Sequence, residues 1–159
     1  MHVDDNLFVS DRAHVVFPYH KALDQAWDGA KADGKKIGAT GRGIGPCYTD
    51  KMSRCGIRMA ELYDAGLFRE KLAENIAQKN GVLAQYAKGG PPERLSLEAI
   101  SEEFRGYAER LRPHVCDTVE LMAGFLRSGK RILYEGAQGA MLDVDFGTYP
   151  FVTSSNATA

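Results

Sequence analysis

A glycine-rich stretch between Gly38 and Pro46 carries groups that could bind an anion. It reads Gly-Ala-Thr-Gly-Arg-Gly-Ile-Gly-Pro, so closely spaced backbone N–H groups stand beside the hydroxyl of Thr40 and the guanidinium of Arg42. Donors of these kinds suit a phosphate group. The stretch is neither the GxxxxGKS/T pattern of a P-loop nor a GxGxxG that follows a strand, so it does not predict a nucleoside triphosphate site. It predicts either a phosphate-binding loop or a purely structural turn.

Three cations, Lys51, Arg54 and Arg58, follow shortly after this stretch. Arg54 could bind a phosphate through two parallel hydrogen bonds, which a lysine cannot form. The alternative is a solvated basic edge of the protein, because isolated surface charges are common and contribute little. The residues alone leave both interpretations open.

A second group of hydrogen-bonding side chains lies near the end of the sequence. Gln138 stands between glycines in the segment Tyr134 to Gly139, beyond the expected end of a strand, where α/β folds commonly bind ligands. Its amide offers two donors and an acceptor, so it could recognise a purine edge. Short polar side chains follow, namely Thr148, Thr153, Ser154, Ser155 and Asn156. Such residues are also ordinary turn formers, so by themselves they are a weak signal.

Other residues with chemical potential are assigned structural roles. Asp143 and Asp145 would share a face on a strand and have no defined relation on a loop, so we expect structural hydrogen bonds from them. The three cysteines, Cys47, Cys55 and Cys116, lack CxxC or Cys/His spacing, which indicates free thiols in a reducing compartment. The four histidines are dispersed, so no metal site is expected from them.

The composition is that of a soluble globular protein with one domain. The chain has 159 residues, 44% hydrophobic and 26% charged, and its formal net charge is -1. Because 20 Lys and Arg are balanced by 21 Asp and Glu, charge gives no support to nucleic-acid binding. We find neither an apolar run of membrane-spanning length nor the pattern of a signal peptide. The expected location is the cytoplasm, with no membrane partner.

Apolar periodicity predicts that the middle of the chain is helical. A stripe of apolar residues at helical spacing predicts a helix from Tyr19 to Ala32. The glycines and the proline that follow predict a loop from Lys35 to Tyr48. Helical spacing returns from Met59 to Tyr86, where Asn80-Gly81 could bend the helix or end it.

Two more helices are expected after a break at Gly89-Gly90-Pro91-Pro92. Ser96 is placed to cap a helix whose apolar face runs from Leu97 to Leu111. The stretch from Val115 to Leu126 predicts a further helix that ends near Gly129.

The pattern changes at Arg131. Ile132 to Tyr134 is a short apolar run that predicts a buried strand, and loops are expected beyond it. The sequence thus predicts a single partial domain over residues 1–159, with a helical part at about 19–129 and a strand with ligand loops at about 131–159. The fold class is α/β. Because one strand cannot build a sheet, we expect the chain to be a segment of a longer protein.

Three motifs, taken together and in order, closely resemble the adenylosuccinate synthetase family. They are Gly38 to Pro46, Tyr134 to Gly139, and Asp145-Phe146-Gly147-Thr148-Tyr149-Pro150-Phe151-Val152-Thr153-Ser154-Ser155-Asn156. The resemblance covers essentially the whole chain and corresponds to a middle portion of a family member. It implies part of a larger α/β enzyme that is similar to P-loop NTPases.

The resemblance also implies a reaction and a set of ligands. In this family GTP phosphorylates the 6-oxygen of IMP, and L-aspartate then displaces the phosphate to give adenylosuccinate, with Mg2+ assisting. Thr40 is similar to the threonine that contacts the IMP phosphate, and Gln138 and Thr153 are similar to two further IMP ligands. Arg54 resembles the arginine that reaches IMP in the neighbouring subunit of a homodimer.

The family's catalytic aspartate and histidine have no counterpart in this sequence, and the same holds for its GTP, Mg2+ and aspartate sites. The resemblance therefore implies a partial IMP site and no activity of the chain alone. The alternative is a non-catalytic helical interaction module that has retained the motif loops.

Overall fold

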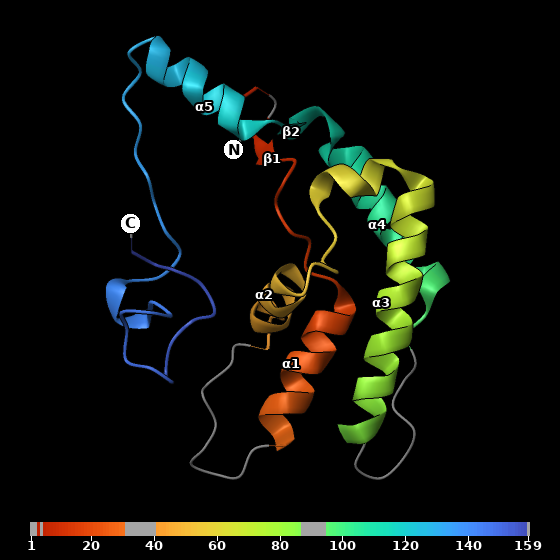
Figure 1. Cartoon of the computed structure of the whole chain (residues 1–159). Helices are drawn as coiled ribbons and strands as arrows, with labels where there is room; N and C mark the ends of the chain where they lie inside the picture. The colour runs from red at the N-terminus through yellow and green to blue at the C-terminus, as the bar shows by residue number, and fades with distance from the viewer. Residues whose placement is uncertain (1–2, 4, 31–40, 87–94, 159) are drawn as a thin grey trace.

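The computed structural model describes residues 3, 5–30, 41–86 and 95–158, and within them the chain is mostly helical (Figure 1). The elements in chain order are β1 (Val9–Ser10), α1 (Pro18–Ala30), α2 (Ile44–Met52), η1 (Met59–Tyr63), α3 (Ala65–Tyr86), α4 (Leu97–Leu111), η2 (Arg112–His114), β2 (Val115–Cys116), α5 (Thr118–Arg127) and η3 (Ala140–Leu142). Helix α1 packs against α2 and α3, and α4 packs against α3 and η1. No helix of these residues is long and apolar enough to cross a membrane.

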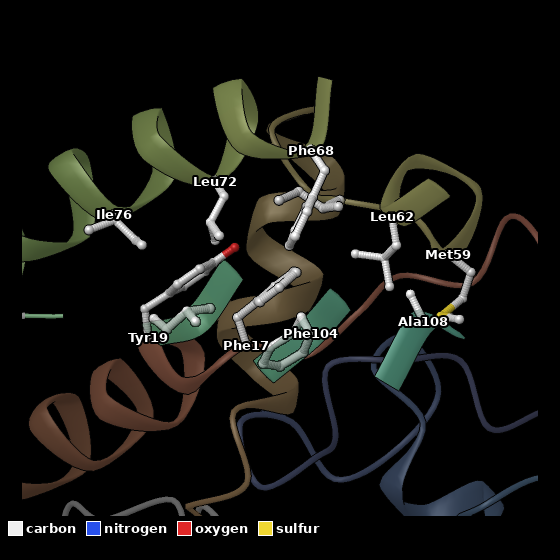
Figure 2. Packing of buried hydrophobic residues seen from close by; sticks show 11 residues of the cluster. Phe17, Tyr19, Met59, Leu62, Phe68, Leu72, Ile76, Phe104 and Ala108 are labelled. Carbon is white, nitrogen blue, oxygen red and sulfur yellow. The ribbon is translucent and has the colours of Figure 1, made fainter. Parts of the chain in front are cut away.

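The hydrophobic core lies where α1, η1, α3 and α4 meet (Figure 2). Phe17, just before α1, is fully buried at its centre; its ring stacks on Tyr19 with centroids 5.3 Å apart and meets Phe104 of α4 at 4.4 Å. Leu72 and Ile76 cover this group from α3. Each such side chain contributes about 1.5–3 kcal/mol by its burial, so this cluster fixes the helices that carry the candidate site.

The expected helix from Tyr19 to Ala32 is confirmed as α1 as far as Ala30, and residues 31–32 lie outside the described part. The loop expected over Lys35 to Tyr48 is only partly right. Residues 35–40 lie outside the described part, and α2 already begins at Ile44. Pro46 fits there because the first N–H groups of a helix have no partner within it, so a missing N–H costs nothing. The start of α2 was not predicted because glycine and proline are frequent in this stretch and usually indicate a loop.

Helix α3 continues through Asn80-Gly81 without a break to Tyr86. The Asn80 side chain accepts a hydrogen bond from the Leu95 N–H at 3.2 Å and so holds the start of the next segment. Ser96 caps α4 as predicted, because its hydroxyl accepts the Ala99 N–H at 3.2 Å.

A two-stranded parallel pair that the sequence analysis did not predict joins the segment before α1 to the segment between α4 and α5. Val9 pairs with Val115, and Ser10 with Cys116. The last predicted helix therefore begins at Thr118 rather than Val115, with Asp117 as its N-cap. Arg12 binds the Asp117 carboxylate through two hydrogen bonds of 3.1 and 2.9 Å and ties β1 to this cap.

The strand predicted for Ile132 to Tyr134 is wrong. These residues form no regular element, and the Leu133 and Tyr134 side chains are 90% and 75% exposed. A strand needs a neighbour for its N–H and C=O groups, and no described segment runs beside this one. The chain instead runs from α5 as an extended segment to the compact turn region that ends at the C-terminus (Figure 1).

Candidate functional site

The described part of the glycine-rich loop is held against α1. Gly43 has a φ of 81°, and its N–H donates to the Asp24 carboxylate at 3.0 Å. A Cβ at Gly43 would lie 2.8 Å from the His20 backbone, so only glycine allows this approach. The loop therefore enters α2 in a fixed direction, and the next residues form the first turn of that helix.

The last predicted motif meets this first turn. The Ser154 hydroxyl lies 3.2 Å from the position of a Cβ on Gly45. Thr153 is held next to it, because its N–H donates to the Leu142 carbonyl at 2.9 Å. Two of the three motifs that could bind a ligand are thus brought together by the fold.

A buried carboxylate organises the loop that carries Thr153. The Asp143 side chain is fully buried and accepts the N–H groups of Asp145 and Phe146 at one oxygen, at 2.9 and 3.0 Å. Its other oxygen accepts from Ala157 and from the N–H and hydroxyl of Thr158. Led by the Phe146 bond, these donors outweigh burial and hold the pKa of Asp143 well below its usual range. The structural role predicted for Asp143 is confirmed.

Of the other two predicted ligands on this side, Gln138 is described by the structure and Thr40 is not. Gln138 is exposed and directly precedes Gly139, the N-cap residue of η3. The Leu142 carbonyl that holds Thr153 belongs to the same η3 turn, so Gln138 and Thr153 are parts of one loop. Thr40 lies outside the described residues.

Arg54 stands at the opposite end of α2 in an unusual conformation. Its φ is 65°, and it is the non-glycine residue with a positive φ among those described. Its N–H donates to the Lys51 carbonyl and the Cys55 N–H donates to the Asp50 carbonyl, at 3.2 and 3.1 Å. These two bonds define a Schellman motif, whose left-handed position is usually glycine. An arginine here accepts backbone strain, which is typical of residues kept for function.

Arg54 lines a basic cavity of about 430 Å³. The cations in its lining are Arg12, Lys51, Arg54, Arg58 and Lys71, and its acids are Asp11 and Glu61. The cations predicted from the sequence as a cluster, Lys51, Arg54 and Arg58, are therefore brought together.

Ion pairs within the structure neutralise only some of the cavity cations, so the others are available to bind an anion. Arg12 is bound to Asp117, and Lys71 is 2.6 Å from a Glu61 carboxylate oxygen. Within the described ranges, Lys51, Arg54 and Arg58 form no ion pair. A cavity with several uncommitted cations can attract and hold an anion.

His14 and Gly56 both line the cavity. A Cβ at Gly56 would lie 2.5 Å from the His14 Nδ1 atom. We expect Gly56→Ala to lower the free energy of unfolding by about 1–2 kcal/mol, because the imidazole or the backbone must move to make room. Urea unfolding followed by circular dichroism would measure this loss.

Gly81→Ala is the matched control for that substitution. No atom lies within 4 Å of a Cβ at Gly81, which is inside α3. Alanine there should leave stability unchanged or raise it, because alanine favours a helix more than glycine does. Equal losses at both positions would contradict the assigned role of Gly56.

His14 should make stability depend on pH. Burial, together with the positive charges of Arg58 and Lys51, lowers the pKa of His14 from its ordinary 6.5. The unfolded chain therefore binds a proton more readily than the folded chain, so stability is complete above pH 6.5 and falls as pH drops through the folded pKa. Urea midpoints measured between about pH 8 and pH 5 should show this decline. In His14→Phe the decline should be smaller, whereas an unchanged profile would exclude His14 as its source.

Sequence reasoning missed a buried polar network beneath Arg54. The Asp50 carboxylate is 3.0 Å from the His20 Nε2 atom and 2.6 Å from the Lys79 Nζ atom, and all three residues are buried. Burial disfavours the charge of Asp50, but the hydrogen bonds from His20 and Lys79 outweigh it and keep its pKa below the ordinary value. One signal was present: Lys79 continues the buried stripe of Leu72, Ile76 and Leu83, where an unpaired lysine could not remain.

The fold is a mostly helical part of an α/β protein, with two of the predicted motif loops at one end of α2 and a basic cavity at the other. The family model for adenylosuccinate synthetase matches residues 1–159. The chain belongs to the adenylosuccinate synthetase family.

Individual relatives agree with this assignment. The chain is 51% identical over 157 residues to adenylosuccinate synthetase of Caldanaerobacter subterraneus, and 50% identical over 156 residues to that of Clostridium beijerinckii. Each match covers 98% of this chain, and 36% and 35% of the respective relative. The structure of fully ligated adenylosuccinate synthetase from Plasmodium falciparum is similar with a TM-score of 0.87 and 37% identity, over 98% of this chain and 35% of that one. The chain thus spans about a third of the length of these relatives.

Proposed function

We propose that this chain supplies part of an IMP-binding site, with Thr40, Gln138 and Thr153 as ligands from one subunit and Arg54 from another. The observation that carries the proposal is the contact between Ser154 and the first turn of α2. The first turn of α2 directly follows the glycine-rich loop, so its contact with the loop of Ser154 and Thr153 supports a shared site for a phosphate and a purine.

The position of Arg54 supports its action across a homodimer. Helix α2 has nine residues and separates Arg54 from the glycine-rich loop, a length of about 13 Å. An arginine at this end of α2 is remote from a ligand bound at the other end of the same helix. The basic cavity around it would then face the anionic ligand of the partner subunit.

The reaction proposed for the whole protein is that of the family. GTP would phosphorylate the 6-oxygen of IMP, and L-aspartate would displace the phosphate to form adenylosuccinate. Among the described residues, no group of three or more His, Cys, Asp or Glu side chains could hold a metal ion. The Mg2+ ion that would assist the reaction is part of the proposal for the whole protein. The proposed partners are these small molecules and a second copy, in the cytoplasm.

A titration of the chain with IMP, followed by NMR, tests the binding proposal. We expect saturable shifts at Gln138 and Thr153 with IMP and weaker ones with ATP or inorganic phosphate. Thr153→Val should reduce the response to IMP, whereas Thr118→Val, on α5, should not. Equal responses to all three ligands would contradict an IMP site.

A chimaera tests the contribution to catalysis. In it, this chain replaces the matching segment of the Caldanaerobacter relative, which is 51% identical. The folded chimaera is expected to form adenylosuccinate from IMP, GTP and L-aspartate. A folded but inactive chimaera that binds no IMP would overturn the proposal.

A further inference from the structure

We propose that Asp50, Asn75, His20 and Lys79 form a buried positioning network that presets Arg54 for its anionic ligand. The inference rests on the proposed function, because it assigns a purpose to the placement of Arg54. None of the four side chains needs to touch the ligand itself. They act through the backbone on both sides of Arg54.

The backbone that follows Arg54 is bonded to one carbonyl group of α2. The N–H groups of Cys55 and Gly56 both donate to the Asp50 carbonyl, at 3.1 and 3.0 Å. The turn that contains Arg54 is therefore hydrogen-bonded to a single residue of α2. A movement of Asp50 would strain these two bonds and so shift the backbone of Arg54.

The Asp50 side chain is in turn fixed from two other helices. His20, on α1, accepts the Phe17 N–H at its Nδ1 atom at 2.9 Å, so the ring proton lies on Nε2 and is donated to Asp50. Lys79, on α3, donates to the other carboxylate oxygen at 2.6 Å. Because both oxygens of Asp50 are held, α2 cannot rotate or slide at this point without breaking a buried bond.

The chain leaving Arg54 is held by α3. Asn75 is buried and donates to the Cys55 carbonyl at 2.9 Å, and Lys71 donates to the Gly56 carbonyl at 3.2 Å. The left-handed conformation of Arg54 is therefore determined by its surroundings, as a strained functional residue requires. A preset backbone leaves only the side-chain torsions of Arg54 to be ordered on binding, which favours affinity.

A matched pair of substitutions separates positioning from general stability. Asn75→Leu removes a side-chain donor to the Cys55 carbonyl, whereas Tyr63→Phe removes one to the Ala108 carbonyl, 3.2 Å away on α4. NMR relaxation of the 159-residue chain should give an order parameter near 0.85 for the Arg54 N–H and a value below about 0.6 in Asn75→Leu. Tyr63→Phe should leave it unchanged. Lys71→Met, which frees the Gly56 carbonyl, repeats the test should Asn75→Leu not fold.

Kinetics of the chimaera described above give the functional readout. We expect Asn75→Leu to raise the KM for IMP about tenfold with little change in kcat, and Tyr63→Phe to alter neither. Equal effects of the two variants on KM, or an Arg54 order parameter that stays high in both Asn75→Leu and Lys71→Met, would overturn the network. If Arg54→Gly leaves the KM for IMP unchanged, the proposed role of Arg54 fails instead, and the order parameters still decide whether the network presets the turn.

Discussion

Lys79→Met is expected to lower the free energy of unfolding by about 3–5 kcal/mol, because it leaves a buried carboxylate without its cationic partner. Asp50 and Lys79 are both buried, and their charged atoms are 2.6 Å apart. Methionine has a similar length and an apolar end, so the loss would come from the charge rather than from a cavity. Urea unfolding of the chain, followed by circular dichroism, measures the effect.

The double variant Asp50→Asn/Lys79→Met is the control for this prediction. It removes both charges and keeps an oxygen to accept the His20 Nε2–H. Replacing a buried ion pair by neutral groups is often nearly neutral in free energy, so most of the lost stability should return. If the double variant is as unstable as Lys79→Met, the loss arises from packing and the ionic account is wrong.

Arg54→Gly is expected to change stability and ligand binding in opposite directions. Glycine adopts the left-handed conformation without strain, which should stabilise the fold by about 0.5–1 kcal/mol after allowing for the greater freedom of glycine in the unfolded chain. Loss of the guanidinium should weaken IMP use by roughly 1.5–3 kcal/mol, the usual size of a charge-assisted contact. Thermal unfolding of the chain and the KM for IMP of the chimaera measure the two effects.

Arg58→Gln is the comparison for the functional part. Arg58 lines the same cavity but has ordinary extended backbone, so its replacement should affect binding through charge and bring no gain in stability. An unchanged KM in Arg54→Gly would exclude Arg54 as a ligand. A loss of stability there would show that the side chain contributes more to the fold than its backbone strain costs.

Local sequence signals were enough for the helices of this chain and for part of its candidate site. Apolar periodicity found α1, and the serine pattern at Ser96 found the start of α4, because both depend on neighbouring residues. The cluster of Lys51, Arg54 and Arg58 was likewise visible from spacing along one helix and the turn after it.

Features that depend on distant parts of the chain were not accessible in this way. The pairing of Val9 with Val115 involves strands of two residues, too short to leave an alternating pattern. The run from Ile132 to Tyr134 has the composition of a strand, yet pairing partners decide whether it becomes one. The left-handed backbone of Arg54 contradicts the usual preference for glycine, so only the structure reveals it.

The order of synthesis determines when β1 and β2 can pair. Arg12 and Asp117 are 105 positions apart, so β1 can pair with β2 only after the helices between them have been translated. At about 5–20 residues per second, this interval is roughly 5–20 s. During that time the β1 backbone groups that later bond β2 are available to chaperones or to incorrect pairing. The salt bridge between Arg12 and Asp117 can form only after this interval, together with the β1–β2 pairing.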